Sequence, residues 1–347
     1  MTGRLRIAVI GLGARSRTWL KVLSAHPGVI VTGLADPSAE ARHAAGVLFP
    51  DAATAPDAAA LARTAQADAA ILVTPPGGRA AQIDACLAAG WDILAEKPLA
   101  DSVAEAARFV ARAEAAGRQL LVGLNFRYLP VTRAYRAALD EGRVGAPEFG
   151  RFLYERWRDG RLPHLNRYPL QMDHPMLWEQ SVHHFDLMRH VYRREPLRID
   201  ARTWNPSWSM YRGHANVSAL IEFEGGMHVT YQGTWAGGVD RLDFDWRTDC
   251  TNGVLIQREM MGGLVAATRQ GEFAPVETAA HEPWITDAAA LLDMAVRAFT
   301  GTGPAECTGR DHLSSLLMLE ACIRSSDRGG PVELAELHDE TTSEEHA

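Results

Sequence analysis

Lysine is almost absent from this chain. Among its 35 lysine and arginine residues, only Lys21 and Lys97 are lysines. Arginine keeps its proton in a protein, whereas a lysine ammonium can take part in proton transfer. Lys97 lies in Glu96-Lys97-Pro98, directly after the apolar run 93–95, which predicts a buried strand. Because open parallel sheets bind ligands at the carboxyl ends of their strands, Lys97 is a catalytic candidate, although Lys21 shows that lysine also occurs without such a setting.

The chain also lacks an excess of positive charge, a long apolar segment and closely spaced cysteines. A net charge of −8 argues against a nucleic-acid surface, which needs a basic stripe. The apolar runs are short and Gly11 interrupts the first of them, so we expect neither a membrane helix nor a signal peptide. The cysteines have no Cys-x-x-Cys spacing, which predicts free thiols and a cytoplasmic location. They are Cys86, Cys250, Cys307 and Cys322.

The first part of the chain alternates short apolar runs with alanine-rich segments. The runs predict strands at 5–10, 29–35, 69–73, 93–95 and 120–124, and the segments between them predict helices at 16–25, 38–48, 79–89 and 102–116. Nearly continuous apolar strands that alternate with helices indicate a parallel sheet covered on both faces. We therefore expect an α/β fold that begins with a dinucleotide-binding domain of the Rossmann type over residues 1–128.

The pattern changes after about residue 130. Longer strands are predicted at 149–157, 198–204, 217–223 and 227–234, and Glu224-Gly225-Gly226 is a hairpin signal between the last two. Helices are expected at 131–141, 287–299 and 311–325. We therefore predict a second, α+β domain over residues 129–335 with a large, mostly antiparallel open sheet. The acidic, polar residues 336–347 are expected to form a loose tail.

A glycine-rich turn links the first predicted strand to the first helix. It places two glycines of the dinucleotide fingerprint after the strand, while Ser16 stands at the third glycine position. Glycines let the backbone approach a pyrophosphate, which then lies on the helix N-terminus. The alternative is a structural turn without a ligand. The predicted cofactor-binding residues of the turn are Gly11, Leu12, Gly13, Ala14, Arg15 and Ser16.

Asp36 ends the second predicted strand, about 20 residues beyond the glycine turn. A carboxylate there accepts hydrogen bonds from ribose hydroxyls and repels the 2′-phosphate of NADP, which favours NAD. Asp36 could also serve as the N-cap of the helix that starts near Ser38. Arg15 and Arg42 lie close enough in the sequence to keep NADP open as a cofactor.

A carboxylate and a histidine lie four residues apart near residue 180. No proline or glycine interrupts 176–194, so we expect one helix with Glu179 and His183 on the same face. Asp186 is placed to hold the histidine ring. Such a pair gives a general base that titrates near neutral pH, although a surface acid–base pair is the simpler alternative. The order Glu-x-x-x-His lacks the usual ligand spacing, so no metal site is predicted.

Together these motifs resemble the Gfo/Idh/MocA family of NAD(P)-dependent sugar and cyclitol oxidoreductases. The resemblance covers about residues 5–333. It implies a Rossmann domain followed by an α/β domain whose open sheet forms dimers or tetramers. It also implies an active site of Lys97, Glu179 and His183 facing the nicotinamide, and a cis peptide before Pro98. The matching segments are Gly11 to Ser16, Asp36, Thr74-Pro75-Pro76, Glu96-Lys97-Pro98, Gly123-Leu124-Asn125-Phe126-Arg127 and Glu179 to Asp186.

The chain departs from the family pattern at two places. Many members have aspartate where this chain has Glu179, whose carboxylate reaches about one methylene further and changes the expected substrate pose. Many members have histidine where this chain has Arg79, which puts a nucleotide contact at that position in doubt. The resemblance further implies cofactor contacts from Thr74, Pro75, Pro76, Glu96, Lys97 and Asn125.

We therefore predict an NAD(P)-dependent enzyme that moves a hydride between nicotinamide and a secondary hydroxyl or ketone of a sugar, sugar derivative or cyclitol. Aromatic faces and fixed donors suit a polyhydroxylated ring, although any single tryptophan can instead fill the core. Three alternatives stay open. One is an NAD-dependent glycosidase that works by transient oxidation and elimination, and another is a dinucleotide-sensing regulator without turnover. The third is a dihydrodiol or biliverdin-type reduction, which shares the Rossmann half. The predicted substrate-binding residues are Arg127, Trp157, His164, Tyr168, Glu179, His183 and Trp235.

Overall fold

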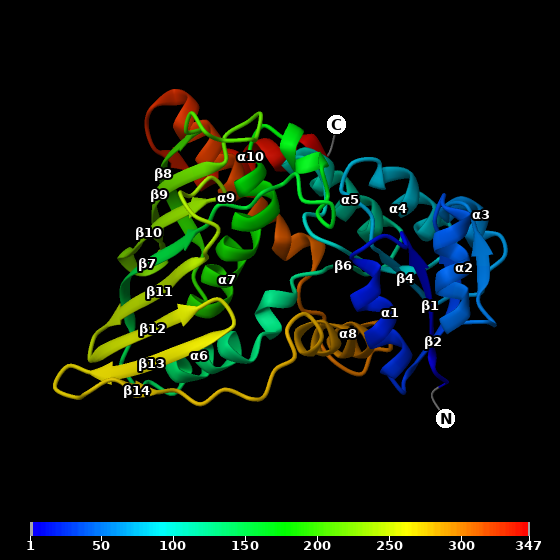
Figure 1. The fold of residues 1–347 in the computed structure, drawn as a ribbon, viewed down its shortest axis with the longest axis horizontal. Coiled ribbons are helices and arrows are strands. Elements are labelled where there is room, and N and C mark those ends of the chain that lie inside the picture. The colour runs from blue at the N-terminus through cyan, green and yellow to red at the C-terminus, as the bar shows by residue number, and fades with distance from the viewer. Residues whose placement is uncertain (1–2, 346–347) are drawn as a thin grey trace. The chain divides into compact units, whose positions relative to one another are not determined.

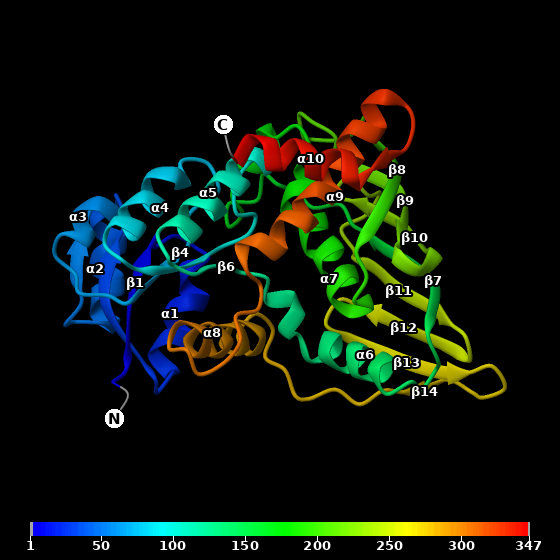
Figure 2. The same ribbon diagram turned by 180° about the vertical axis from the view of Figure 1, so that it is seen from behind.

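The computed structural model describes residues 3–345, with side chains up to residue 340, and the chain forms two compact units. The first contains the chain up to Tyr128 together with Glu282–Leu313, and the second contains Leu129–His281 and Ser314–Ser343. Figures 1 and 2 show the elements from opposite sides. In the described part of the chain, no helix is long and apolar enough to cross a membrane.

The first unit is built on a parallel sheet of six strands, as the sequence predicts. Its strand order is β3-β2-β1-β4-β5-β6. The order reverses direction between β1 and β4, which is where open sheets of this type bind ligands. The strands are β1 (Leu5–Ile10), β2 (Val29–Ala35), β3 (Ala53–Ala55), β4 (Ala69–Leu72), β5 (Asp92–Ala95) and β6 (Leu120–Val122).

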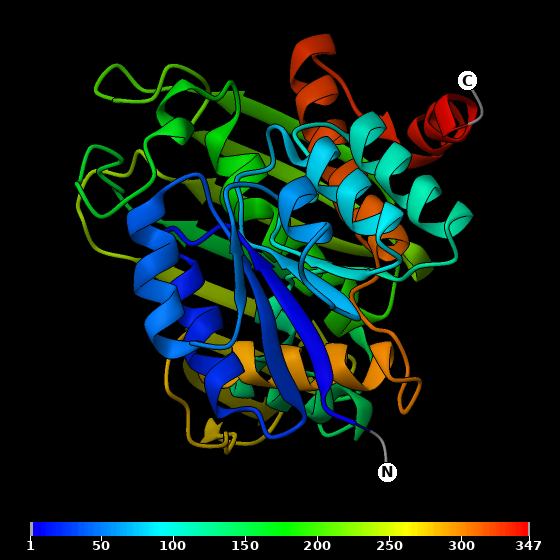
Figure 3. The same cartoon turned by 90° about the vertical axis from the view of Figure 1, so that its right-hand side faces the viewer.

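Helices cover both faces of this sheet. In Figure 3 the blue strands lie between the blue helices α1 and α2 on one side and the cyan-to-teal helices α4 and α5 on the other. Serine side chains cap two of these helices: Ser38 accepts from the Ala41 N–H, and Ser102 accepts from the Glu105 N–H. The helices and turns are α1 (Ser16–Ala25), α2 (Ala39–Leu48), α3 (Ala58–Ala62), α4 (Arg79–Ala88), α5 (Val103–Ala115), η1 (Asn125–Tyr128) and α8 (Thr286–Phe299).

The late segment 282–313 belongs to this first unit, although the sequence places it in the second domain. Its helix α8 contacts α1 and η1, and the Gln119 amide donates to the carbonyl of Ala298 at 3.0 Å. The sequence of a helix does not indicate which distant element it packs against. The prediction therefore grouped segment 282–313 with the residues next to it in the chain.

The second unit contains a mixed, mostly antiparallel sheet of nine strands in the order β14-β13-β12-β11-β7-β10-β9-β8-β15. Only β7 and β10 pair in parallel among the neighbours with a described register. The sequence predicts four of these strands and misses the others. The strands are β7 (Pro147–Glu155), β8 (Pro196–Trp204), β9 (Asn216–Phe223), β10 (Met227–Thr234), β11 (Asp243–Cys250), β12 (Gly253–Glu259), β13 (Gly262–Thr268), β14 (Ala274–Pro275) and β15 (Val332–Glu333).

One face of this sheet is covered by helices of the same unit, as Figure 1 shows for α6 and α7. Phe152, Tyr231 and Trp246 are buried on that face. On the other face, Phe149 on β7 is 57% exposed and Leu220 on β9 is 46% exposed. The helices are α6 (Pro130–Asp140), α7 (Val182–Tyr192), most of α9 (Gly309–Arg328) and α10 (Leu334–Glu345), with a short 3-10 turn η2 (Tyr168–Gln171).

Two local predictions are wrong. Residues 176–194 are not one α-helix, because a π-helical turn, η3 (Leu177–Ser181), precedes α7. The segment after residue 333 is not an irregular tail, because it forms α10 as far as Glu345. A π-turn inserts one residue into an otherwise helical segment without a mark in the residue types, whereas the acidic composition of 334–345 hides its helical preference.

Candidate active site

The glycine turn after β1 has the shape that a pyrophosphate requires. Gly11 has a φ of 93°, and a Cβ there would lie 2.8 Å from Thr74 Cγ2 and from the Val73 carbonyl oxygen. A Cβ on Gly13 would meet nothing within 4 Å, so the backbone at this position is open to a ligand. Ser16 is buried, and its hydroxyl donates to the Gly13 carbonyl at 2.7 Å. The turn therefore forms an anion cradle at the N-terminus of α1.

Asp36 joins the end of β2 to the glycine turn. Its carboxylate accepts from the Leu12 N–H at 2.7 Å and from the Ser38 N–H at 2.8 Å. The alternative of an Asp36 N-cap is wrong, because Ser38 itself caps α2. Each carboxylate oxygen keeps acceptor capacity for a ribose hydroxyl. Arg42 donates to the Asp36 carbonyl at 2.6 Å and is thereby drawn to the backbone of this loop.

Glu96 is a buried carboxylate that connects α1 to the end of β5. It accepts from Arg15 Nε at 2.6 Å and from Trp19 Nε1 at 2.7 Å. Burial by itself raises the pKa of Glu96, but the charge of Arg15, the two donors and the charge of Lys97 outweigh this effect and hold the pKa below its ordinary value. Glu96 is therefore ionised, and Arg15 is held beside it.

Arg79 holds both flanks of Lys97. This fully buried side chain donates from Nη1 to the carbonyl oxygens of Glu96 at 2.7 Å, Pro98 at 2.6 Å and Leu99 at 2.9 Å. Its Nη2 donates to the carbonyl of Thr74. The peptide between Lys97 and Pro98 is cis, as the family resemblance implies. Arg79 thus binds backbone carbonyls of residues 96–99 and of the loop at Thr74. The only sign of this role in the sequence is that arginine stands where many family members have histidine.

Two residues expected near ligands are held by the late segment of the first unit. The Asn125 amide donates to the buried Asp287 carboxylate, and Arg127 Nη2 lies 2.5 Å from Asp311 Oδ2. Because both partners come more than 150 residues later in the chain, the sequence does not reveal them. In the neighbouring loop, the Thr74 hydroxyl donates to the Gln82 side-chain oxygen at 2.7 Å.

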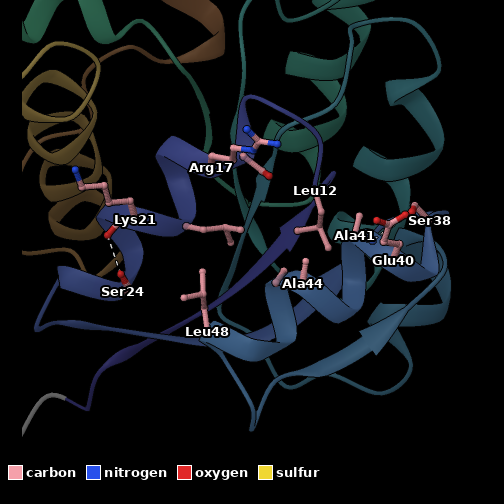
Figure 4. Close-up of a pocket in the computed structure, with 12 residues that line it drawn as sticks. Leu12, Arg17, Lys21, Ser24, Ser38, Glu40, Ala41, Ala44 and Leu48 are labelled. Atoms are coloured by element: carbon pink, nitrogen blue, oxygen red, sulfur yellow. Dashed lines mark hydrogen bonds between the residues drawn. The ribbon is translucent and has the colours of Figure 1, made fainter. Parts of the chain in front are cut away.

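A cavity of about 580 Å³ lies in the first unit between α1 and α2. Figure 4 shows Leu12 of the glycine turn pointing toward it beside Ala41 and Ala44 of α2. Small and aliphatic side chains form most of its wall, and the polar groups at its rim, such as Lys21 and Glu40, belong to exposed helix surfaces. The cavity is therefore an apolar recess next to the turn.

In the second unit, Glu179 and His183 lie on the consecutive elements η3 and α7. The Tyr168 hydroxyl donates to Glu179 Oε1 at 2.7 Å, so these two predicted residues come together. His183 lies in the first turn of α7 and is 6% exposed. The extra residue of the π-turn is stabilised by the Ser181 hydroxyl, which donates to the Met176 carbonyl at 3.1 Å. Such turns are frequent at functional sites.

The neighbouring His184 has a different environment. It is fully buried, and its Nδ1 lies 2.8 Å from the Tyr231 hydroxyl, which donates to the Ser181 hydroxyl at 2.8 Å. Burial lowers the pKa of His184 to about 3, so its ring is neutral at physiological pH. Asp186, also buried, accepts from the Ser315 hydroxyl at 3.3 Å. These contacts fix the start of α7, where His183 lies.

The remaining predicted substrate residues have different degrees of exposure. Trp235 is 3% exposed, Trp157 is partly buried and His164 is exposed. Arg158 belongs to the segment of aromatic and basic residues that the sequence associates with substrate recognition, and its guanidinium carbon lies 4.4 Å from the centre of the Trp235 ring.

Two family models match the chain. One, described as an oxidoreductase family with an NAD-binding Rossmann fold, matches residues 5–124, and the other, a GFO/IDH/MocA C-terminal domain, matches residues 132–256. The chain is 30% identical to an uncharacterized protein of Sinorhizobium fredii, y4oX, over 96% of this chain and 95% of that protein. It is 27% identical to a D-apiose dehydrogenase of Paraburkholderia graminis, over 97% and 92% of the two chains.

A solved structure shares the fold. An inositol dehydrogenase homolog from Azotobacter vinelandii, crystallised with NADH and myo-inositol, superposes with a TM-score of 0.83. The match covers 95% of this chain and 98% of that chain at 17% identity. At this identity the likeness shows the fold alone.

Proposed function

This chain belongs to the Gfo/Idh/MocA family of NAD-binding oxidoreductases, and on that basis we propose that it oxidises a secondary hydroxyl group of a sugar, sugar derivative or cyclitol, or reduces the corresponding ketone. The observation that carries the proposal is the placement of Lys97. It lies at the carboxyl end of β5 in a loop that Arg79 holds through three carbonyl groups, and its neighbour Glu96 is tied to the glycine turn through Arg15. The similarity to a sugar dehydrogenase supports the substrate class.

The cofactor-binding residues in this proposal surround the glycine turn. The Gly11 conformation and the open backbone at Gly13 fit the pyrophosphate, and the Asp36 carboxylate fits the ribose hydroxyls of NAD. When bound, NAD accepts or returns the hydride. Contacts described above hold some of the other proposed cofactor-binding residues in place. These other residues are Leu12, Ala14, Arg15, Ser16, Thr74, Pro75, Pro76, Glu96, Lys97 and Asn125.

Three side chains act on the substrate. His183 takes the hydroxyl proton as a general base, and Lys97 donates a hydrogen bond to the same oxygen and stabilises its developing negative charge. The two residues can exchange these roles. Glu179, oriented by Tyr168, binds a neighbouring hydroxyl and supports the basicity of His183. The proposed substrate contacts also include Arg127, Trp157, His164 and Trp235.

Two further properties belong to the proposal. The exposed face of the nine-stranded sheet is the surface through which the chain forms a homodimer or homotetramer, and its apolar residues Phe149 and Leu220 support this. In this proposal residues 1–128 bind the cofactor and residues within 129–335 bind the substrate, while the late segment 282–313 packs in the same compact unit as the cofactor-binding residues. The buried free cysteines suit a cytoplasmic protein.

The test compares the two lysines of the chain. Lys97→Arg keeps the charge but replaces a compact ammonium by a planar guanidinium, and we expect kcat to fall by about 100-fold or more. Lys21→Arg is the matched control, because Lys21 is 58% exposed and pairs with Glu282 on the surface. NADH formation would be followed by its ultraviolet absorbance in a screen of sugars, inositols and their keto forms with NAD and NADP.

A near-normal kcat in Lys97→Arg would sink the assignment of Lys97. Net NADH release from a simple sugar separates this reaction from a glycosidase that oxidises its substrate only transiently, because that enzyme regenerates its cofactor within each turnover. Tight dinucleotide binding without turnover on the whole panel would instead indicate a regulator.

A further inference from the structure

We infer that the second unit binds a carboxylate group through Arg158, and that the substrate of the proposed reaction is therefore a sugar acid such as a uronic or aldonic acid. This inference rests on the proposed function for its reaction, but the binding site itself rests on Arg158, Trp235 and the residues packed around them. All of these residues belong to the second unit.

The guanidinium of Arg158 is held in one place by its neighbours. Its Cζ lies 4.4 Å from the centre of the buried Trp235 ring, a distance at which an arginine stacks on an aromatic face. Tyr211 packs beside Trp235, with the two ring centres 5.8 Å apart, and its hydroxyl donates to the Arg158 carbonyl at 2.8 Å. The side chain is thus ordered before any ligand arrives.

Two buried donors near the Arg158 guanidinium lack a well-aligned acceptor. Within the described chain, Arg158 Nη1 and Trp235 Nε1 make no hydrogen bond of good geometry, and the weaker polar contacts of these side chains are with the phenol oxygens of Tyr211 and Tyr154. Buried donors normally have partners, and a buried donor without a well-aligned acceptor is a cost to the fold. A ligand that brings acceptor atoms to this group would recover that cost.

The charge of Arg158 is also uncompensated among the described residues. Nearby arginines have carboxylate partners: Arg156 lies 3.0 Å from Asp240, and Arg161 lies 2.9 Å from Asp159. Within the part of the chain that the structure describes, no carboxylate forms an ion pair with Arg158. Burial raises the pKa of the adjacent Tyr211 phenol, which stays neutral and provides no counter-charge. The group therefore carries one net positive charge.

The position of the group relates it to the reacting residues of the same unit. Tyr154 on β7 interacts with Arg156 and Arg158 just beyond the strand, and its ring packs 4.9 Å from that of His184. His184 is the chain neighbour of His183, the proposed base. Tyr154 thus adjoins both the Arg158 group and the first turn of α7, which suits a substrate with a hydroxyl at one end and an anionic group at the other.

A single guanidinium matches a carboxylate better than a phosphate. Its two parallel N–H groups fit the two oxygens of a carboxylate, and its single charge balances a monoanion. A phosphate monoester carries a charge of about −1.5 to −2 at pH 7 and needs a second cation. The Arg156 charge is already balanced by Asp240, so this site supplies only one unbalanced positive charge.

The experiment compares acids with neutral sugars that have the same ring hydroxyls. Glucuronate, galacturonate and mannuronate are measured against glucose, galactose and mannose, and gluconate and galactonate extend the acid series. We expect the wild-type protein to have the higher kcat/KM for an acid. In Arg158→Gln, the ratio of kcat/KM for the acid to that for its neutral partner should fall by about 100-fold.

Arg161→Gln is the matched control, since Arg161 is an exposed arginine that already pairs with Asp159, and it should keep the wild-type ratio. General damage to the fold lowers both rates and leaves the ratio unchanged, so the ratio isolates the recognition of the acid. An unchanged ratio in Arg158→Gln, or a wild-type preference for the neutral sugars, overturns the inference.

Binding without turnover separates this inference from the proposed reaction. Each acid is titrated into the NAD-bound protein while tryptophan fluorescence is recorded, because a ligand at Arg158 changes the surroundings of Trp235. Saturable binding that Arg158→Gln abolishes supports the carboxylate site even if no NADH forms, in which case the proposed reaction fails alone. Binding of none of the acids, or equal Arg158-dependent binding of glucose 6-phosphate, overturns the carboxylate assignment.

Discussion

At the scale of single residues, the molecule places one buried arginine behind its one candidate catalytic lysine. Arg79 has no exposed surface and donates to four backbone carbonyls, three of them in residues 96–99. Arginine suits this position because its planar fork can bind several acceptors at once and keeps its charge when buried. Its role is to position the loop that carries Lys97, not to contact the substrate.

Replacement of Arg79 by methionine should affect both stability and turnover. We expect the free energy of unfolding to fall by about 4 kcal/mol, since four buried carbonyls lose donors worth about 1 kcal/mol each. We expect kcat to fall by up to about 100-fold because a displaced loop misplaces Lys97. Urea unfolding and initial rates measure the two effects. Arg108→Met, at an exposed site on α5, should change neither; equal stability of both variants would refute the role of Arg79.

At the scale of elements, the junction between η3 and α7 depends on a neutral histidine. His184, Tyr231 and Ser181 form one buried chain of hydrogen bonds that fixes the π-turn and the first turn of α7. Burial holds the pKa of His184 at about 3, against 6.5 for an ordinary histidine. The folded chain therefore resists protonation of this ring, while the unfolded chain accepts the proton.

This difference predicts how stability depends on pH. Below about pH 6.5 the unfolded state binds one more proton than the folded state, so the stabilising effect is complete above that pH and is lost as the pH falls toward 3. The contribution of His184 to the slope approaches about 1.4 kcal/mol per pH unit. Urea unfolding of His184→Gln should show a correspondingly flatter pH dependence. His43→Gln, at an exposed position on α2, should keep the wild-type slope, and an equal slope in both variants would contradict the prediction.

At the scale of the whole molecule, the nine-stranded sheet leaves one face to solvent. Leu220 on β9 lies opposite Thr230 on β10, which in turn lies opposite Arg151 on β7, so these side chains share that face. Leu220 is 46% exposed there and Phe149 is 57% exposed. A long sheet with an exposed apolar face favours association with a second copy.

We expect Leu220→Glu to convert the assembled protein into monomers, because it places a charge in the apolar part of the proposed interface. Sedimentation velocity measures the mass in solution. Val47→Glu is the control, since Val47 is 72% exposed on α2 of the first unit and its replacement should leave the assembly intact. A wild-type mass for Leu220→Glu would remove this face from consideration.

Local signals in the sequence were enough for the features that depend on neighbouring residues. The glycine turn, the strand that precedes it and the parallel sheet were predictable because strand period, turn chemistry and helix caps act within a few residues. The same reasoning named Lys97 as a candidate and named Tyr168 and Glu179 among the substrate residues, and the structure joins the last two by a hydrogen bond. Strands such as β11 were missed, since charged residues alternate with apolar ones and no tight turn marks their limits.

The sequence by itself determined the fold class, the cofactor-binding turn and the lysine on which the proposed reaction depends. Only the tertiary structure decided what holds these residues. Arg79 reaches carbonyls about 20 residues away, Asn125 binds Asp287, and Arg158 stacks on Trp235. Such contacts depend on how distant segments pack, because a side chain's partner is set by the folded arrangement and not by its neighbours in the chain.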